Sequence, residues 1–214
     1  MSRTCSWQEF DTVPQDPPGQ LHYVGPLGCV PQQLPAYSLP WAQDDLRPLI
    51  LVSYSTSFQD QVRMLQRIAD AVAGLPARVL LTLGKAIFAG ELQLPDNVVA
   101  QTFVPHAAVL PHASLVVTHA GHGTVMAAIT AGVPLICTPM GRDQYVVSGC
   151  VERRGLGLVA SATASPEELR NTIVAALEDD ALRERARNFA AGLDVEAGLQ
   201  RAIEVLENMR LPHA

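Results

Sequence analysis

Lysine is nearly absent from this 214-residue sequence, in which Lys85 is the single example and the net charge is −6. A surface that binds nucleic acid needs clustered basic side chains, so the composition argues against a nucleic-acid partner. Long apolar runs are missing too. Nothing approaches the roughly 20 residues of a membrane span, and the first residues lack the apolar core of a signal peptide. We therefore expect a cytoplasmic protein with no membrane span.

Motifs for disulfide and metal chemistry are also missing. The four cysteines are scattered and form no C-x-x-C; they are Cys5, Cys29, Cys137 and Cys150. Because Cys137 lies within an apolar run, we expect buried thiols in a reducing compartment. No D-x-D occurs, so the sequence lacks the usual carboxylate pair that holds Mg²⁺ or Mn²⁺ beside a diphosphate.

From residue 49 onward, short apolar strands alternate with helical patterns. We expect strands at 49–54, 78–83, 98–102, 114–118, 134–138 and 156–159, and helices at 59–73, 107–110, 122–131, 143–153, 166–178, 181–191 and 195–209. This alternation predicts parallel β-α-β units, and the continuous apolar strands predict a sheet covered on both faces. The fold class is therefore α/β, and ligands should bind at the carboxyl ends of the strands.

Residues 1–48 have a different composition, with prolines recurring throughout. Such spacing precludes a helix and disrupts sheet pairing. We expect an extended connector here, with one short edge pairing and turn at 23–28. Residues 49–214 then form the domain proper.

The run from Thr118 to Thr124 reads T-H-A-G-H-G-T and leads from a buried-strand pattern into a small-residue helix. A strand, a glycine-rich turn and a helix aim free N–H groups and a positive helix end at one point, which favours a phosphate. Glycine lets the backbone approach the anion closely. The candidate phosphate-binding residues are His119, Gly121, His122, Gly123 and Thr124.

Three other interpretations of this run stay open. It matches half of a dinucleotide fingerprint, although Met126 stands where the third glycine is needed. His119 and His122 form an H-x-x-H, although no third zinc ligand lies nearby in the sequence. The glycines could also serve the turn alone.

Polar or aromatic residues follow other strands as well. Asp143 and Gln144 carry groups suited to sugar hydroxyls, although Asp143 could simply cap a helix. Phe103 and His106 could flank a nucleobase, or form a core ring beside a turn. Three hydroxyls after the first strand are candidate phosphate donors or ordinary turn residues: Ser53, Ser55 and Thr56.

Five stretches of the sequence carry a family resemblance: 51–56, 103–106, 119–124, 131–134 and 141–144. Together they resemble the C-terminal half of the two-domain, GT-B, UDP-glycosyltransferase-like enzymes, which include bacterial natural-product and macrolide glycosyltransferases. The resemblance implies a Rossmann-like domain that binds a nucleotide diphosphate sugar as substrate, without a cofactor or metal ion. It assigns the diphosphate to the 119–124 loop and to Ser55 or Thr56. It assigns the sugar hydroxyls to Asp143 and Gln144, and the base and ribose to Phe103, Val104 and His106.

The resemblance also implies an inverting transfer of the sugar to a hydroxyl of a small natural product. Many relatives that use uridine donors carry a ribose-binding Glu where this chain has Ala127, so we expect a thymidine diphosphate sugar in preference to a uridine one. Bacterial relatives often have Asn where Val147 stands, which affects the geometry of the donor loop.

In this family the N-terminal half supplies the acceptor pocket and the catalytic histidine. No residue here is therefore expected to be catalytic, and residues 1–48 resemble a remnant of the interdomain connector. We expect this chain alone to bind nucleotide and to turn over little. Two alternatives stay open: a non-catalytic nucleotide-sugar-binding subunit or scaffold of a split glycosyltransferase, and a GT-B epimerase.

Overall fold

A computed structural model describes residues 3–4, 6–16, 21–26, 37–54, 61–85, 87–195 and 197–208. Two predicted phosphate donors, Ser55 and Thr56, lie outside the described residues, as do Cys5 and Cys29.

The centre of the molecule is a six-stranded parallel sheet. Its strands are β3 (Leu49–Ser53), β4 (Arg78–Thr82), β5 (Val98–Gln101), β6 (Ala113–Thr118), β7 (Leu135–Cys137) and β8 (Gly157–Val159). They are ordered β5-β4-β3-β6-β7-β8, and every pair is parallel. The chain builds outward from β3 in one direction and then returns to add β6 on the other side. This confirms the predicted Rossmann-like α/β fold.

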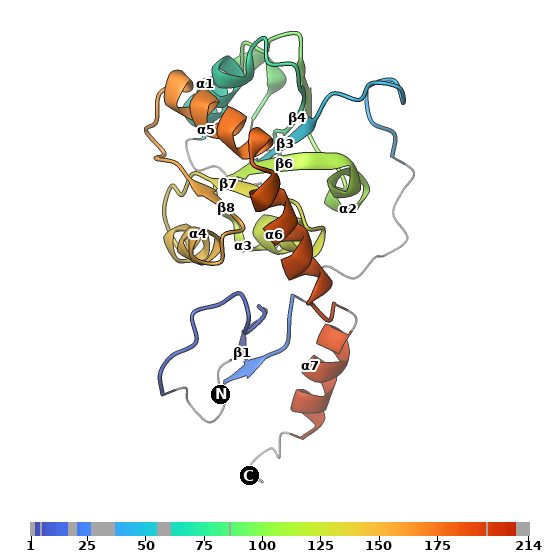
Figure 1. Ribbon diagram of the computed structural model, residues 1–214, viewed down its shortest axis with the longest axis vertical. Coiled ribbons are helices and arrows are strands. Elements are labelled where there is room, and N and C mark those ends of the chain that lie inside the picture. Colours follow the sequence, from blue (N-terminus) through green and yellow to red (C-terminus); the bar gives the residue numbers. More distant parts are fainter. Residues whose placement is uncertain are drawn as a thin grey trace.

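Helices cover both faces of the sheet (Figure 1). On one face lie α1 (Val62–Val72) and α5 (Pro166–Glu178), and on the other lie α2 (His106–Val109), α3 (His122–Thr130) and α4 (Gln144–Arg153). Helix α6 (Asp180–Ala191) continues from α5 and contacts α3. Two 3₁₀ turns complete the domain, η1 (Ala89–Glu91) and η2 (Leu110–His112).

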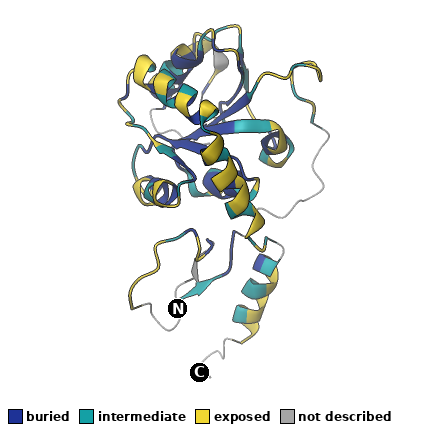
Figure 2. Ribbon diagram, viewed as in Figure 1, coloured by how far each residue is buried: buried dark blue, intermediate teal, exposed yellow. Residues whose placement is uncertain are grey.

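Successive residues of each strand point to opposite faces, so the sheet separates two hydrophobic clusters. Ile50, Val52 and Val117 belong to the cluster under α1 and α5. Leu51 and Val116 belong to the cluster under α3 and α4. Figure 2 shows the central strands as buried throughout. Both faces are covered, which explains why the strands read as unbroken apolar runs.

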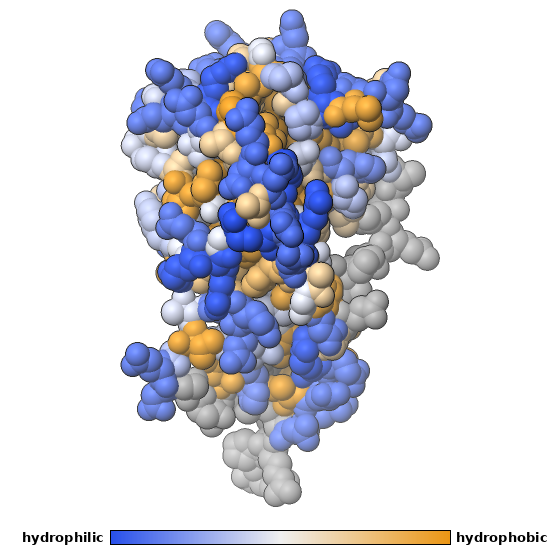
Figure 3. Space-filling model, in the orientation of Figure 1, coloured by the Kyte–Doolittle hydropathy of each residue, from blue (hydrophilic) through white to orange (hydrophobic). Residues whose placement is uncertain are grey.

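Local signals in the sequence place the helix ends. Ser165 Oγ accepts a hydrogen bond from the Glu168 amide, and the Glu168 carboxylate accepts one from the Ser165 amide, which makes the capping box at the start of α5. Gly155 has φ +65° just after α4, a conformation that favours glycine. The surface of α6 is polar, and Figure 3 shows hydrophilic residues gathered over it.

The N-terminal segment packs on the domain and on the last helix. Strands β1 (Arg3–Thr4) and β2 (His22–Tyr23) pair in parallel, near α7 (Ala197–Glu207), below the main body in Figure 1. Trp7 and Phe10 are buried in the α3–α4 cluster. The Arg154 guanidinium donates to the carbonyls of Phe10 and Asp11. No helix among the described residues is long and apolar enough to cross a membrane.

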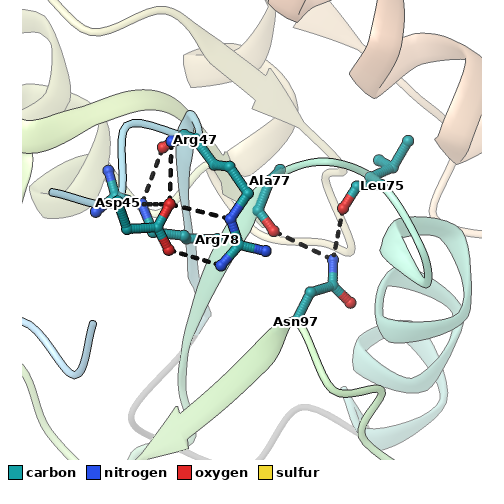
Figure 4. Close-up of polar contacts among 6 residues, drawn as sticks. All are labelled: Asp45, Arg47, Leu75, Ala77, Arg78 and Asn97. Atoms are coloured by element: carbon teal, nitrogen blue, oxygen red, sulfur yellow. Dashed lines mark hydrogen bonds and ion pairs between the residues drawn. The ribbon is translucent and has the colours of Figure 1, made fainter. Parts of the chain in front are cut away.

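Polar contacts at the amino ends of β3 and β4 join the loops there (Figure 4). Hydrogen bonds from Arg47 lower the pKa of Asp45 to about 2, and Arg78 Nε donates to the Arg47 carbonyl at 2.9 Å. Asn97 Nδ2 donates to the carbonyls of Leu75 and Ala77, both at 3.3 Å. Both sets of contacts lie at the end of the sheet opposite to the predicted site.

Candidate functional site

The carboxyl ends of β3 and β6 lie side by side where the order of strands reverses. In open α/β sheets this switch point leaves a crevice in which ligands bind. Ser53 ends β3 and pairs with Thr118, which ends β6. The predicted 119–124 loop therefore starts at the switch point.

The start of α3 presents unpaired amides to this crevice. Gly121 is the N-cap residue, and its carbonyl accepts the first hydrogen bond of the helix, from the Val125 amide at 3.1 Å. Within the described part of the chain, no hydrogen bond is recorded for the amides of His122, Gly123 and Thr124. The first turn has no acidic residue. These donors and the positive helix end suit an anion.

The turn into α3 requires a particular backbone. Ala120 is buried and has φ +67°, a conformation uncommon for a residue with a side chain. A Cβ at Gly121 would lie 2.7 Å from both Cε1 and Nε2 of His119. The absence of a side chain at Gly121 therefore lets the Nε2 edge of the imidazole lie over the N-cap of α3.

At Gly123 the situation is different, because a Cβ would meet nothing within 4 Å. The packed ring of His119 thus conflicts with a side chain at 121, whereas nothing conflicts with one at 123. A purely structural role of the turn therefore explains the glycine at 121 but not the glycine at 123.

His119 is 7% exposed and packs against Tyr54, with ring centroids 5.5 Å apart and planes at 30°. Its Nδ1 lies 3.4 Å from Thr118 Oγ1. Burial lowers the pKa of His119; the backbone of Ser53 and the Asp143 carboxylate raise that pKa, and Arg142 lowers it further. Burial outweighs the opposing effects, so the imidazole is neutral near pH 7.

The residues after β5 contribute one exposed ring and one internal contact. The Phe103 side chain is 74% exposed, whereas the Val104 side chain is buried in the core, which leaves only its main chain for a ligand. His106 Nε2 lies 3.0 Å from Ser53 Oγ. That bond ties α2 to the end of β3 and occupies the Ser53 hydroxyl, which the sequence had offered as a possible phosphate donor.

The segment after β7 begins at the same edge of the sheet, because the end of β7 pairs with the end of β6. Gln144 is buried, and its Oε1 accepts hydrogen bonds from the amides of Met140 at 2.8 Å and Gly141 at 3.2 Å. Asp143 is the N-cap residue of α4, but its exposed side chain makes no capping hydrogen bond. Capping alone therefore does not explain Asp143.

Sequence reasoning missed two residues beneath the loop, Tyr54 and Thr138. Their hydroxyls bond each other, and Thr138 Oγ1 donates to the Thr118 carbonyl at 3.4 Å. A signal was available: apolar strands end on a hydroxyl residue at Ser53, Thr82 and Thr118, and β7 is followed by Thr138. Hydroxyls in line at the carboxyl edge of a buried sheet indicate a polar network there.

The described residues contain no group of three or more His, Cys, Asp or Glu side chains placed to hold a metal ion. The zinc interpretation of His119 and His122 therefore finds no third ligand in the part of the chain that the structure covers. Cys137 and Cys150 are buried free thiols, as predicted, and burial raises the pKa of Cys137 to about 12.

Two histidines, the buried His119 and the half-buried His106, should determine how stability depends on pH. Burial lowers the pKa of both His106 and His119 below the ordinary value near 6.5. The unfolded chain therefore binds more protons on acidification, and the free energy of unfolding should fall between about pH 7 and pH 5. In urea unfolding across this range, the free energy of unfolding should depend less steeply on pH in His106→Gln and His119→Gln than in the wild type. The exposed His112→Gln serves as the control. An unchanged slope in both the His106→Gln and the His119→Gln variant would contradict this account.

Residues 66–209 match the family described as "Erythromycin biosynthesis protein CIII-like, C-terminal domain". The chain is 31% identical over 198 residues to demethyllactenocin mycarosyltransferase of Streptomyces fradiae, covering 90% of this chain and 42% of that protein.

Two solved structures are similar in fold and sequence. The glycosyltransferase of kitacinnamycin matches with a TM-score of 0.75 and 28% identity, over 87% of this chain and 49% of that one. Glycosyltransferase VinC in complex with DTDP matches with a TM-score of 0.64 and 26% identity, over 88% and 49%. The chain thus spans about half the length of these relatives.

Proposed function

Because this chain belongs to the family of erythromycin biosynthesis protein CIII-like C-terminal domains, we propose that it binds the nucleotide-sugar donor of an inverting, metal-independent glycosyltransferase. The observation that carries this proposal is the convergence of three unpaired amides of α3 with the imidazole of His119 at the switch point of the sheet. The diphosphate carries the negative charge of a nucleotide sugar, so it is the part of the substrate that most needs N–H groups to bind it.

The diphosphate would lie against the amides of His122, Gly123 and Thr124, within reach of the Thr124 hydroxyl and of His119 Nε2. In the transfer, an acceptor hydroxyl attacks the anomeric carbon from the face opposite to the departing diphosphate. Negative charge then builds on the diphosphate oxygens. Preorganised donors stabilise that charge, and loss of one such donor typically costs about 3 kcal/mol in the barrier.

The other two sides of the crevice would hold the rest of the donor. The free carboxylate of Asp143 suits sugar hydroxyls, and Gln144, which braces the preceding loop, lies beside it. The exposed ring of Phe103 suits stacking on a base, with the main chain of Val104 next to it and His106 behind.

The base is proposed to be thymine and the pentose a 2′-deoxyribose. Ala127 of α3 offers no carboxylate to a ribose 2′-hydroxyl, and the similar VinC structure holds DTDP. The nucleotide-sugar is a substrate, and no further cofactor is proposed.

The base that activates the acceptor hydroxyl would come from a second half, covalently joined or separate. Large apolar side chains are exposed in the segments that follow β4 and β7 and support such docking: Phe88, Tyr145 and Val146. The acceptor is proposed to be a small natural product, as the relative's name mycarosyltransferase suits. A non-catalytic binding subunit would show the same crevice but give no transfer when the second half is supplied.

Calorimetric titration tests the donor site. We expect thymidine diphosphate to bind more tightly than uridine diphosphate, because the 2′-hydroxyl of the uridine compound would give up hydrogen bonds to water without gaining one beside Ala127. Ala127→Glu should shift the preference toward uridine diphosphate by roughly tenfold, the effect of one hydrogen bond to a charged group. Equal or tighter binding of uridine diphosphate by the wild type would overturn the thymidine preference. No binding of either would overturn the proposed function.

A further inference from the structure

Three buried hydroxyl residues form a network beside the imidazole of His119, and they come from the carboxyl ends of three neighbouring strands. Tyr54 follows β3, Thr118 ends β6, and Thr138 follows β7. All three are buried together with His119. Burying polar groups is costly unless they are hydrogen-bonded, so each hydroxyl needs a partner.

The direction of the hydrogen bonds follows from their acceptors. Thr138 Oγ1 donates to the Thr118 carbonyl at 3.4 Å, so it must accept from the Tyr54 hydroxyl. Burial raises the pKa of Tyr54, so its hydroxyl keeps the proton that it donates. The resulting chain runs from Tyr54 through Thr138 to Thr118, and it fixes the position of the tyrosine ring.

That ring forms the wall against which the imidazole packs, 5.5 Å between centroids. The edge of the imidazole with Nε2 and Cε1 lies over Gly121. Nδ1 lies beside the Thr118 hydroxyl. The other groups that act on the imidazole are the backbone of Ser53, through a hydrogen bond, and the charges of Asp143 and Arg142.

We propose that Tyr54 is a positioning residue. Its hydrogen bond to Thr138 holds the tyrosine ring in place, and the ring orients His119 Nε2 toward the diphosphate of the nucleotide sugar. The inference rests on the proposed function, since it assumes that His119 meets the diphosphate. It assigns no contact with substrate to Tyr54 itself.

A double-mutant cycle tests this role. Tyr54→Phe keeps the ring and removes the hydroxyl, and Thr138→Val removes the other partner at nearly constant shape. Each should weaken thymidine diphosphate binding by roughly three- to tenfold, and the double variant should weaken it no further, because either change breaks the same link. Thr138→Ser, which keeps the hydroxyl, should bind as the wild type does. Thymidine affinity should not change in any variant.

The His119→Ala background separates positioning from a general structural role. There, Tyr54→Phe and Thr138→Val should have no effect on thymidine diphosphate affinity, since no imidazole is left to orient. Losses that persist in that background, or that multiply in the double variant, would overturn the proposal. If His119→Ala weakens binding but Tyr54→Phe does not, the positioning role alone fails. If His119→Ala leaves binding unchanged, the proposed diphosphate contact fails and the inference with it.

Discussion

Replacing His119 by alanine should weaken thymidine diphosphate binding about ten- to a hundredfold and leave thymidine binding unchanged. The imidazole Nε2 lies over the N-cap of α3, where the unpaired amides gather. A hydrogen bond to a charged group contributes about 1.5–3 kcal/mol, which corresponds to this range of affinity. Calorimetry with the diphosphate and the nucleoside, on the same variant, separates the two contributions.

His112→Ala is the matched control for that measurement. His112 lies in η2, at the amino end of β6, and is exposed. Its replacement should change neither affinity. An equal loss of diphosphate and nucleoside affinity in His119→Ala would mean that the imidazole supports the base or the fold, and the assignment of the diphosphate to it would be wrong.

Gly121→Ala should both destabilise the fold and reduce diphosphate affinity, whereas Gly123→Ala should not destabilise the fold. At position 121 the new methyl group would lie 2.7 Å from two atoms of the His119 ring, which is buried and packed on Tyr54. The ring must move, and overpacking of this kind costs about 1–3 kcal/mol. At position 123 the methyl group would meet nothing, and alanine is favoured over glycine within a helix by about 0.5–1 kcal/mol.

The reason for the loss at Gly121 can be tested in combination with His119→Ala. With the imidazole removed, Gly121→Ala has nothing to displace and should be close to neutral in urea unfolding. A loss of stability that is the same with and without the imidazole would place its cause in the backbone of the turn. Equal stability of Gly121→Ala and Gly123→Ala in the wild-type background would contradict the contact between position 121 and the His119 ring.

Much of the fold was predictable from the sequence because local and long-range signals agree. The strands are buried on both faces, so they read as unbroken apolar runs, and the helix ends carry recognisable caps such as Ser165 with Glu168. The parallel arrangement then follows from the alternation of strands and helices. The pairing of β1 with β2 was less predictable, because the two-residue strand Arg3–Thr4 carries no periodicity.

The candidate site was predictable in outline and not in detail. The T-H-A-G-H-G-T run predicted the start of α3, because a change from an apolar strand to a helical pattern through glycines is visible in the sequence. The sequence does not reveal that the His119 ring lies over Gly121 whereas Gly123 faces open space, because this difference depends on side-chain packing across three strands. The bonds of Ser53 to His106 and of Tyr54 to Thr138 join residues far apart in the chain, so no local spacing reveals them.

A crystal of this protein soaked in thymidine diphosphate tests the central claim most directly. We predict that the two phosphate groups lie at the start of α3, with oxygens within hydrogen-bond distance of the Gly123 and Thr124 amides and of His119 Nε2. Nucleotide bound elsewhere, with the 119–124 loop unoccupied, would contradict the assignment of this loop to the donor diphosphate.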